Sequence, residues 1–104
     1  MVAFNENNRP SREPLFPLGQ VVATPAALQA FVDAGEESGA LPYLVRHQHG
    51  DWGVVDPEDQ YANEQALKHD GRIFSAYLLR DGTKIWIITE ADRSSTCVLL
   101  PQDY

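Results

Sequence analysis

The stretch RIFSAYLLRDGTKIWIITE, residues 72–90, decides the fold class of this chain. Residues 72–79 and 83–90 are both rich in residue types that favour β-strands, and the Asp-Gly pair between them is a strong hairpin signal. A polar turn follows, and residues 95–100 (STCVLL) predict a third strand. We therefore expect an antiparallel meander in the C-terminal part of the chain.

Helices are predicted before this meander. Thr24-Pro25 places a preferred N-cap residue before a proline at the first helical position, which predicts a helix over residues 25–34. Spacings of three and four predict that one apolar stripe of this helix faces the core. The stripe consists of Leu28, Phe31 and Val32.

Two more helices follow in the predicted order. One runs from Pro42 to about Gln48, and Asp56-Pro57 repeats the cap-and-proline pattern at the start of another, which ends near Gly71. The inward residues expected for the first of these are Leu41, Leu44 and Val45. Two or three helices packed on one face of a three- to four-stranded antiparallel meander make an α+β fold.

The domain organisation expected from the sequence is one domain over residues 21–104, preceded by an extended or flexible arm over residues 1–20 that packs Leu15, Phe16 and Leu18 onto it. A chain of 104 residues suits a single core. The single cysteine, Cys97, excludes an internal disulfide framework. The sequence contains no secretion signal and no apolar run near the roughly 20 residues that span a bilayer, so we expect a cytoplasmic protein that does not bind membranes.

Charge is unevenly distributed along the chain. The net charge is −7, from 15 acidic and 8 basic residues, and residues 33–64 carry the whole excess. An acidic chain is a poor non-specific binder of nucleic acid, but this argument does not exclude a local basic pocket. Four carboxylates are candidates for contact with a basic partner, with a solvated helix face as the alternative interpretation. They are Asp56, Glu58, Asp59 and Glu64.

The segment Arg46–Gly53 (RHQHGDWG) is the densest candidate for chemistry. His47 could act as a general acid or base, oriented by Asp51. Zinc could be held by His47, His49, Asp51 and a distant His69, but positions two apart do not share a helix face, so we predict no metal and no cofactor. The simpler alternative is a helix C-terminus stopped by glycine, with the tryptophan closing the core beneath the turn.

The predicted strands offer a second group of candidates. Alternation places Ile73, Ser75, Tyr77 and Leu79 on one face of the first strand, away from Arg72 and its neighbours. Polar residues also gather at the last turn, where rigid sheets often present side chains to ligands. These are Thr89, Arg93 and Thr96. The alternative is that the hydroxyls are ordinary strand residues and that the arginines pair with local acids.

Residues Arg72–Ser75 (RIFS) and Ile85–Thr96 (IWIITEADRSST) resemble the last strands of barnase-type microbial ribonucleases. The order of helices and meander is similar to the wider superfamily that includes RelE-type toxins and colicin nucleases. The resemblance covers about 30 residues, and Arg93 stands where barnase has its catalytic histidine. No counterpart of the glutamate general base is found.

A second resemblance covers residues 18–104. Arg46–Gly53, Arg72–Tyr77, Lys84–Glu90 and the C-terminal Leu-Pro-x-x-Tyr are similar to motifs of a family of small bacterial proteins often labelled plasmid-related. This resemblance implies a setting in mobile genetic elements and brings no established activity.

Two classes of function remain open from the sequence. One is a metal-independent endoribonuclease, with His47 as acid or base, Arg72 and Arg93 as phosphate clamps, and RNA as substrate. Its substrate-binding residues would be Asp51, Ser75, Tyr77, Thr89 and Thr96. Replacing His47 or Arg93 is then expected to abolish cleavage without altering the thermal midpoint.

The other class is an acidic interaction protein. Its carboxylates would mimic nucleic acid against a basic host defence complex, as anti-restriction and anti-CRISPR proteins do. A catalytically inactive member of the nuclease fold, serving as an antitoxin or dimerising module, is a further alternative.

Overall fold

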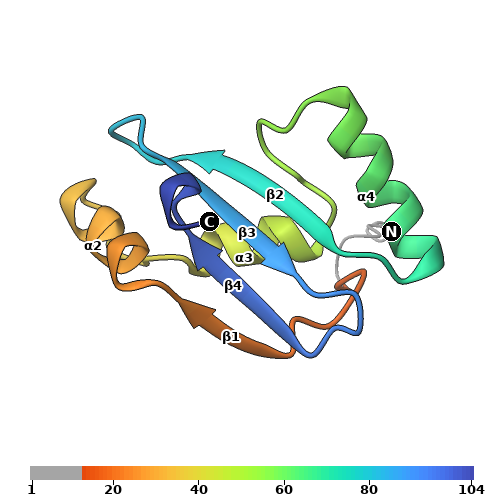
Figure 1. The fold of residues 1–104 in the computed structure, drawn as a ribbon. Coiled ribbons are helices and arrows are strands. Elements are labelled where there is room, and N and C mark those ends of the chain that lie inside the picture. The colour runs from red at the N-terminus through yellow and green to blue at the C-terminus, as the bar shows by residue number, and fades with distance from the viewer. Residues whose placement is uncertain (1–12) are drawn as a thin grey trace, which may run out of the picture.

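The computed structural model describes residues 13–104 as an α+β fold, with helices between the first strand and the other three (Figure 1). The elements are β1 (Gln20–Ala23), α2 (Pro25–Asp33), α3 (Leu41–Gln48), α4 (Pro57–His69), β2 (Ile73–Leu78), β3 (Lys84–Thr89), β4 (Ser95–Leu99) and the 3₁₀ turn η2 (Pro101–Asp103). The three predicted helices and three predicted strands are confirmed. Residues 1–12 of the predicted arm lie outside the described residues.

The sheet has the strand order β1-β4-β3-β2. β2, β3 and β4 form the predicted antiparallel meander. The added strand β1 pairs in parallel with β4, so the sheet is mixed rather than wholly antiparallel. The sequence did not predict β1, because its four residues have no strand periodicity of their own and their partners begin at Ser95. Gly19, with φ +66°, leads into this strand at a point where a Cβ atom would meet the carbonyl oxygens of Arg93 and Ser94.

Both predicted N-caps are confirmed. The Thr24 hydroxyl accepts a hydrogen bond from the Ala27 amide at 3.1 Å, and the Asp56 carboxylate accepts one from the Asp59 amide at 2.9 Å. These bonds satisfy amide groups that have no partner within the first helical turn. The starts of α2 and α4 are therefore determined by residues within each helix terminus.

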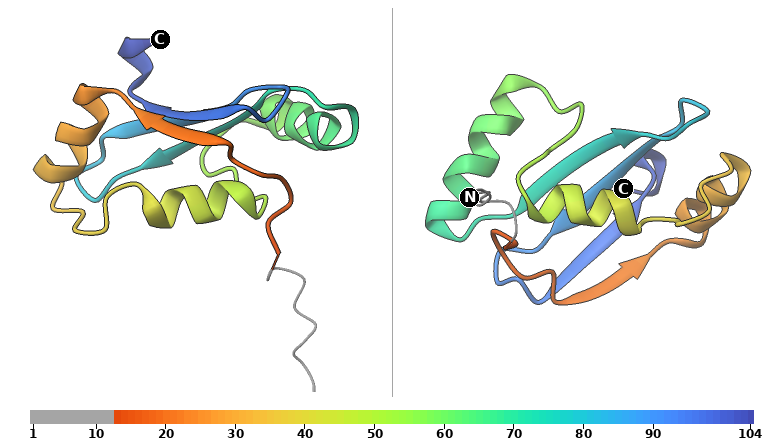
Figure 2. Two further views of the ribbon diagram at one scale, coloured as in Figure 1. Left: turned by 90° about the horizontal axis from the view of Figure 1, so that it is seen from below. Right: turned by 180° about the vertical axis from the view of Figure 1, so that it is seen from behind.

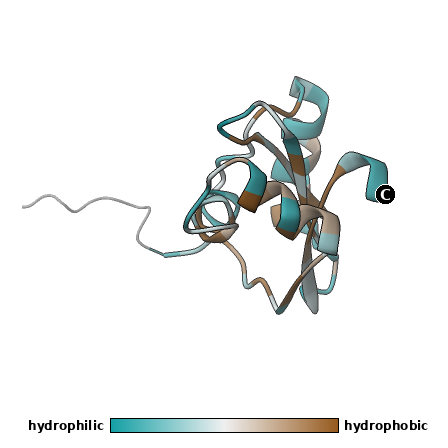
Figure 3. Ribbon diagram, turned by 90° about the vertical axis from the view of Figure 1, so that its left-hand side faces the viewer, coloured by the Kyte–Doolittle hydropathy of each residue, from teal (hydrophilic) through white to brown (hydrophobic). Residues whose placement is uncertain are grey.

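The buried face of α2 differs from the predicted stripe. Ala27, Ala30 and Phe31 are buried, whereas Leu28 and Val32 are 56% and 70% exposed. The helix packs through its two alanines and Phe31 at one end of the sheet, near β4 (Figure 2). Its ribbon accordingly contains both apolar and polar segments where it faces the viewer in Figure 3.

Helix α3 lies across one face of the sheet, which we call the inner face (Figure 2). It buries Leu44 and His47, while Leu41 and Val45, also predicted to point inward, are 63% and 48% exposed. Helix α4 lies beside β2, and η2 stands on the other side of the sheet, which we call the outer face. The helical layer on the inner face is thus mainly α3 (Figure 2). The buried apolar residues form two clusters, one that includes Tyr77 and Ile87 and one that includes Trp52 and Ile73, and Leu18 packs against both.

The chain before β1 is partly packed against the domain. Phe16 is buried and Leu18 is half-buried, as predicted, but Leu15 is 55% exposed. The Leu15 amide donates to the Gln48 carbonyl at 2.8 Å, and the Gln48 side chain returns a bond to the Phe16 carbonyl. Leu15 and Phe16 are therefore bonded to the C-terminal end of α3.

The β2 edge of the sheet is closed by other parts of the chain. The Asn63 side chain accepts from the Phe74 amide at 3.0 Å and donates to the Phe74 carbonyl at 2.7 Å. The Ala76 amide donates to the Trp52 carbonyl, and the Ala76 carbonyl accepts from the Val54 amide. Backbone groups that would otherwise be open to strand pairing are therefore used within the chain. Within residues 13–104, no helix is long and apolar enough to cross a membrane.

Candidate functional site

His47 lies in the interior with no exposed surface, at the junction of α3 and the inner face of the sheet. Its Nδ1 is 2.6 Å from the Ser75 hydroxyl and its Nε2 is 2.9 Å from the Thr89 hydroxyl. The Thr89 oxygen is 2.7 Å from the Thr96 hydroxyl, which donates to the Leu18 carbonyl at 2.7 Å. Four predicted site residues therefore form one buried network.

The direction of the hydrogen bonds in this network follows from its last member. Because the Thr96 proton is used at the Leu18 carbonyl, Thr96 accepts from Thr89, and Thr89 in turn accepts from Nε2–H of His47. Nδ1 then carries no proton and accepts from Ser75. This order of hydrogen bonds assigns His47 a neutral imidazole with its proton on Nε2.

Burial also favours the neutral form of His47. It lowers the pKa of the imidazole to about 4, because the charged form loses its hydration. The ring is therefore neutral at pH 7, and both of its nitrogens already have hydroxyl partners. The surroundings of His47 fit a fixed structural group better than a proton donor that meets a substrate.

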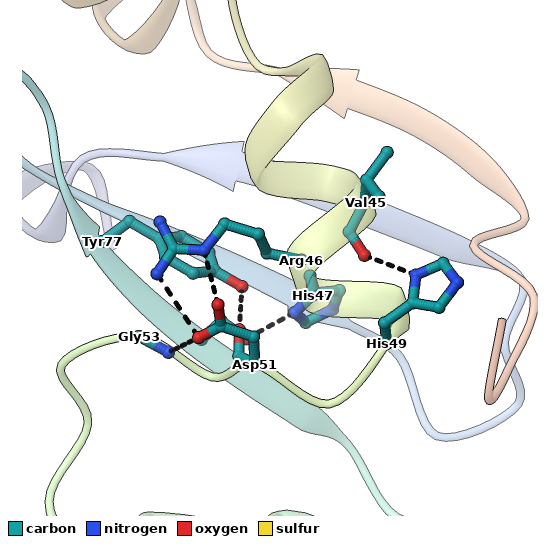
Figure 4. Close-up of polar contacts among 8 residues, drawn as sticks. Val45, Arg46, His47, His49, Asp51, Gly53 and Tyr77 are labelled. Atoms are coloured by element: carbon teal, nitrogen blue, oxygen red, sulfur yellow. Dashed lines mark hydrogen bonds and ion pairs between the residues drawn. The ribbon is translucent and has the colours of Figure 1, made fainter. Parts of the chain in front are cut away.

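Asp51 interacts with Arg46 rather than with His47 (Figure 4). Its carboxylate accepts from Nε of Arg46 at 2.7 Å, from Nη2 at 3.3 Å and from the Gly53 amide at 3.2 Å. The hydrogen bond from Arg46 is the main reason that the pKa of Asp51 lies below its usual value. The expectation that Asp51 orients His47 is therefore wrong.

Tyr77 also contacts this segment from the inner face of β2. Its hydroxyl donates to the Asp51 backbone carbonyl at 2.6 Å, and the Arg46 guanidinium lies 4.6 Å from the centre of its ring. Burial raises the pKa of Tyr77, so the phenol stays protonated. Tyr77 thus anchors the turn after α3, in keeping with the simpler interpretation of this segment.

His49 points away from His47 and bonds to the Val45 carbonyl at 2.7 Å, as Figure 4 shows. The prediction that these two histidines lie on different sides of the helix is confirmed. Within residues 13–104, no three histidine, cysteine or acidic side chains lie together in a way that could hold a metal ion. Trp52 is buried just after the glycine turn, where it closes the core.

Arg93 is held by backbone carbonyls. Its Nη1 donates to Gly71 at 2.6 Å, to Ala91 at 3.0 Å and to Glu90 at 3.1 Å, and its Nη2 donates to Ala66 at 3.1 Å. The guanidinium thereby joins the C-terminal end of α4 to the turn between β3 and β4. The sequence predicted an acidic partner or a phosphate for this arginine, and the structure gives it these carbonyls.

Arg72 lies on the other side of the sheet from His47. Its Nε is 3.3 Å from a Glu90 oxygen, and its Nη1 donates to the Tyr104 hydroxyl at 3.1 Å. The local acidic partner that the sequence offered as an alternative is therefore confirmed for Arg72. His47, Arg72 and Arg93 do not meet at one open site. Replacing His47 removes buried hydrogen bonds, and replacing Arg93 removes the bonds that join α4 to the turn, so both changes argue against the expectation of an unchanged thermal midpoint.

The predicted partner-binding carboxylates gather at the start of α4. Asp56 is its N-cap, Glu58 and Asp59 lie in its first turn, and Glu64 follows further along the helix. Burial, together with the neighbouring Asp56, raises the pKa of Asp59. Helix N-termini favour negative charge, so the placement also fits the alternative of a stabilised, solvated helix end.

Aromatic residues on the outer face were missed as candidates. Phe74 and Trp86 pack edge to face with centroids 5.1 Å apart, and Trp86 packs in the same way on Tyr104 at 5.7 Å. With Arg72 and Ile88 they line a hollow of about 240 Å³. Strand alternation across the predicted hairpin was the signal that could have placed Phe74 and Trp86 together.

Comparisons with protein-family models, with curated proteins and with solved structures find no match. The two resemblances drawn from the sequence therefore stay predictions.

Proposed function

We infer that this chain is an acidic interaction protein that binds a basic protein partner, rather than an RNA-cleaving enzyme. The observation that carries this proposal is that the groups suited to RNA cleavage are already engaged by other groups of the molecule. His47 has two hydroxyl partners and no exposed surface, and the Arg93 guanidinium donates to four carbonyls.

An endoribonuclease of the predicted kind needs an acid or base within hydrogen-bond reach of the ribose and cations on the phosphate. Here the three candidates are far from a shared site. His47, the candidate base, lies on the inner face of the sheet, Arg72 lies at its outer face, and Arg93 lies at the turn between β3 and β4. Arg72 is further compensated by Glu90. The predicted residues thus have no common surface on which an RNA phosphate could contact all of them.

The exposed charge favours the interaction alternative. Asp56, Glu58 and Asp59 crowd one end of α4, and the net charge of the chain is −7. Such a surface attracts a basic partner over long range and increases the rate at which the two meet. The partner class we propose is a cytoplasmic protein with a basic nucleic-acid-binding surface, such as a component of a host defence complex.

The test is a selection of binding peptides from a random display library against the purified protein. We expect enrichment of peptides that contain lysine and arginine, and loss of these binders with the triple variant Asp56→Lys/Glu58→Lys/Asp59→Lys. A matched variant, Glu13→Lys/Asp33→Lys/Glu37→Lys, makes the same charge change at exposed positions elsewhere. Selected peptides without basic residues, or equal binding by the two triple variants, would overturn the proposal.

An RNA assay separates the two classes directly. The wild-type protein is incubated with a single-stranded RNA, beside the variant His47→Gln. We expect no difference between the two, because His47 does not reach the surface. Cleavage by the wild-type protein that His47→Gln abolishes, with the variant shown to be folded, would restore the endoribonuclease hypothesis.

A further inference from the structure

The outer face of the sheet carries apolar side chains that no helix of the described chain covers. Pairing of β2 with β3 places Phe74 beside Ile88 and Ala76 beside Trp86, all on the side away from α3. Of these, Phe74 and Trp86 are half-buried and so reach the surface of the face, whereas Ile88 and Ala76 are buried beneath them. Two residues at the border of this face, Val54 and Leu78, are 51% and 50% exposed. Figure 2 shows that η2 rises from this side while α3 lies on the other.

Two adjoining hollows occupy this face and share Phe74 and Trp86 as walls. The first has a volume of about 240 Å³, and its remaining walls are Arg72, Ile88 and Tyr104. Tyr104 is 71% exposed, so its ring forms the outer rim of this hollow. The walls are largely apolar, and the one charged group, Arg72, is already paired with Glu90.

The second hollow has a volume of about 250 Å³ and an acidic border. Asp56 and Asp59 line it on the side of α4, and Lys84 lines it on the side of β3. Two carboxylates against one ammonium leave this end negative. Burial and the neighbouring Asp56 raise the pKa of Asp59, and a ligand cation in this hollow would offset the repulsion between the two carboxylates.

We propose that the outer face docks an extended segment of the basic partner protein, with an apolar or aromatic side chain in the first hollow and a lysine or arginine in the second. This inference rests on the proposed function and adds the place of docking and the pattern of the ligand. Because the hollows share Phe74 and Trp86, the two ligand side chains lie close together. On an extended chain, side chains two positions apart point to the same side, which gives an apolar-x-basic pattern.

The size of the hollows favours a polypeptide over a small molecule. Pockets for drug-sized ligands measure roughly 300–1,000 Å³, and each hollow here is smaller and open. A volume of about 240 Å³ accommodates one large side chain. Buried aromatic anchors of this type carry much of the binding energy at protein interfaces.

The charge of the face favours a basic polypeptide over the other occupants. Bases of single-stranded RNA could stack on Trp86 and Phe74, but the backbone phosphates would meet Asp56 and Asp59. A second copy of this chain would bring the same net charge of −7 to the interface. A polypeptide segment with an apolar and a basic side chain matches both hollows, the apolar first one and the negative second one.

The test uses a synthetic peptide, Ac-Gly-Ser-Phe-Ser-Lys-Ser-Gly-NH2, titrated into the isotope-labelled full chain and followed by amide and indole NMR shifts. Two control peptides replace the lysine by glutamate or the phenylalanine by alanine. We expect the first peptide to shift the Trp86 indole and the Asp59 amide at millimolar concentration. Either control peptide should bind about tenfold more weakly, a loss equivalent to about 1.4 kcal/mol.

Protein variants locate the site. Trp86→Ala and the double variant Asp56→Asn/Asp59→Asn should each weaken binding by about tenfold or more. Asparagine keeps the N-cap of α4, so the double variant retains the helix start. Leu41→Ala, a change at an exposed apolar residue of α3, is the matched control and should leave binding unchanged.

The outcomes distinguish this inference from the proposed function. If the lysine peptide binds and its shifts map away from Trp86, or binding survives Trp86→Ala, the docking site is wrong while the basic partner stands. If the glutamate peptide binds equally well, the charge argument behind both proposals fails. Stronger shifts of the outer face with an oligouridine than with the peptide would assign the face to single-stranded RNA. The absence of any shift with the three peptides would overturn the docking site.

Discussion

The buried imidazole of His47 makes the stability of this protein depend on pH in a way that can be calculated. Its pKa is about 4 in the folded chain, compared with 6.5 for a solvated histidine. Protonation below pH 6.5 therefore favours the unfolded chain, where the ring is free to take up a proton. This contribution to stability is present above pH 6.5 and is lost progressively as the pH falls toward 4.

The size of the effect follows from the two pKa values. Between about pH 7 and about pH 5, the free energy of unfolding falls by about 2 kcal/mol from this residue alone. The hydrogen-bond network also disfavours protonation of the folded protein. A proton on Nδ1 of His47 would make this nitrogen a donor, so the Ser75 hydroxyl would have to accept from it and its O–H would lose Nδ1 as acceptor. With a typical urea dependence, the midpoint of unfolding should fall by about 1–2 M.

The assay is urea unfolding at both pH values, followed by tryptophan fluorescence, for the wild-type protein and for His47→Gln and His49→Gln. Glutamine does not titrate, so His47→Gln should lose about 2 kcal/mol of the pH dependence. His49→Gln is the matched control, because His49 lies on the other side of α3 and has no part in the buried network. Carboxylates that titrate in the same range affect all three proteins and cancel in the comparison.

A direct titration keeps the prediction testable if His47→Gln does not fold. The ring protons of His47 in the wild-type protein, followed by NMR, should show a midpoint near 4. A midpoint near 6.5, or an equal pH dependence in wild-type protein and His47→Gln, would refute the assignment of a neutral, fully engaged imidazole.

Three further changes test other parts of the structure by urea unfolding at pH 7. Gly53→Ala should cost about 3 kcal/mol or more, because φ is +77° and the new Cβ would overlap a β2 carbonyl. Gly82→Ala, with φ +88° and open space around the new Cβ, should cost about 1 kcal/mol, and equal losses for the two variants would contradict this reasoning. Asn63→Ala should cost about 2 kcal/mol by leaving the Phe74 amide and carbonyl unpaired, and a neutral result would show that water replaces the amide. Arg93→Lys should cost about 1–2 kcal/mol, since one ammonium cannot reach the carbonyls of both α4 and the turn, and unchanged stability would remove its proposed structural role.

The sequence predicted the elements whose signals are local. Thr24-Pro25 and Asp56-Pro57 mark helix starts because the capping oxygen bonds to an amide only three residues away. The three-residue turn Arg80-Asp81-Gly82, in which Gly82 has φ +88°, sets the register of the β2–β3 hairpin for the same reason, since a tight turn fixes which residues face each other. The fold class follows from these short-range rules together with strand composition.

The candidate site was less accessible to such rules. His47, Ser75 and Thr89 were all singled out from the sequence, but their bonds to one another cross 28 and 42 positions of the chain. Residue type alone does not tell whether a histidine lies at the surface, where it can act as an acid or base, or in the core, where it is a structural group. Burial decides between these possibilities, and it assigns His47 to a structural role.

By itself, the sequence determined the helix starts, the hairpin, the alternation of the strands and the acidic middle segment, because each of these depends on neighbours along the chain. Tertiary structure decided the parallel strand β1, the exposure of Leu28 and Val32, and the carbonyl partners of Arg93. It also placed Trp86 between two hollows of the outer face, one of which is bordered by carboxylates at the start of α4. The physical reason is that burial and electrostatic environment are set by groups far apart in the chain, and only folding brings them together.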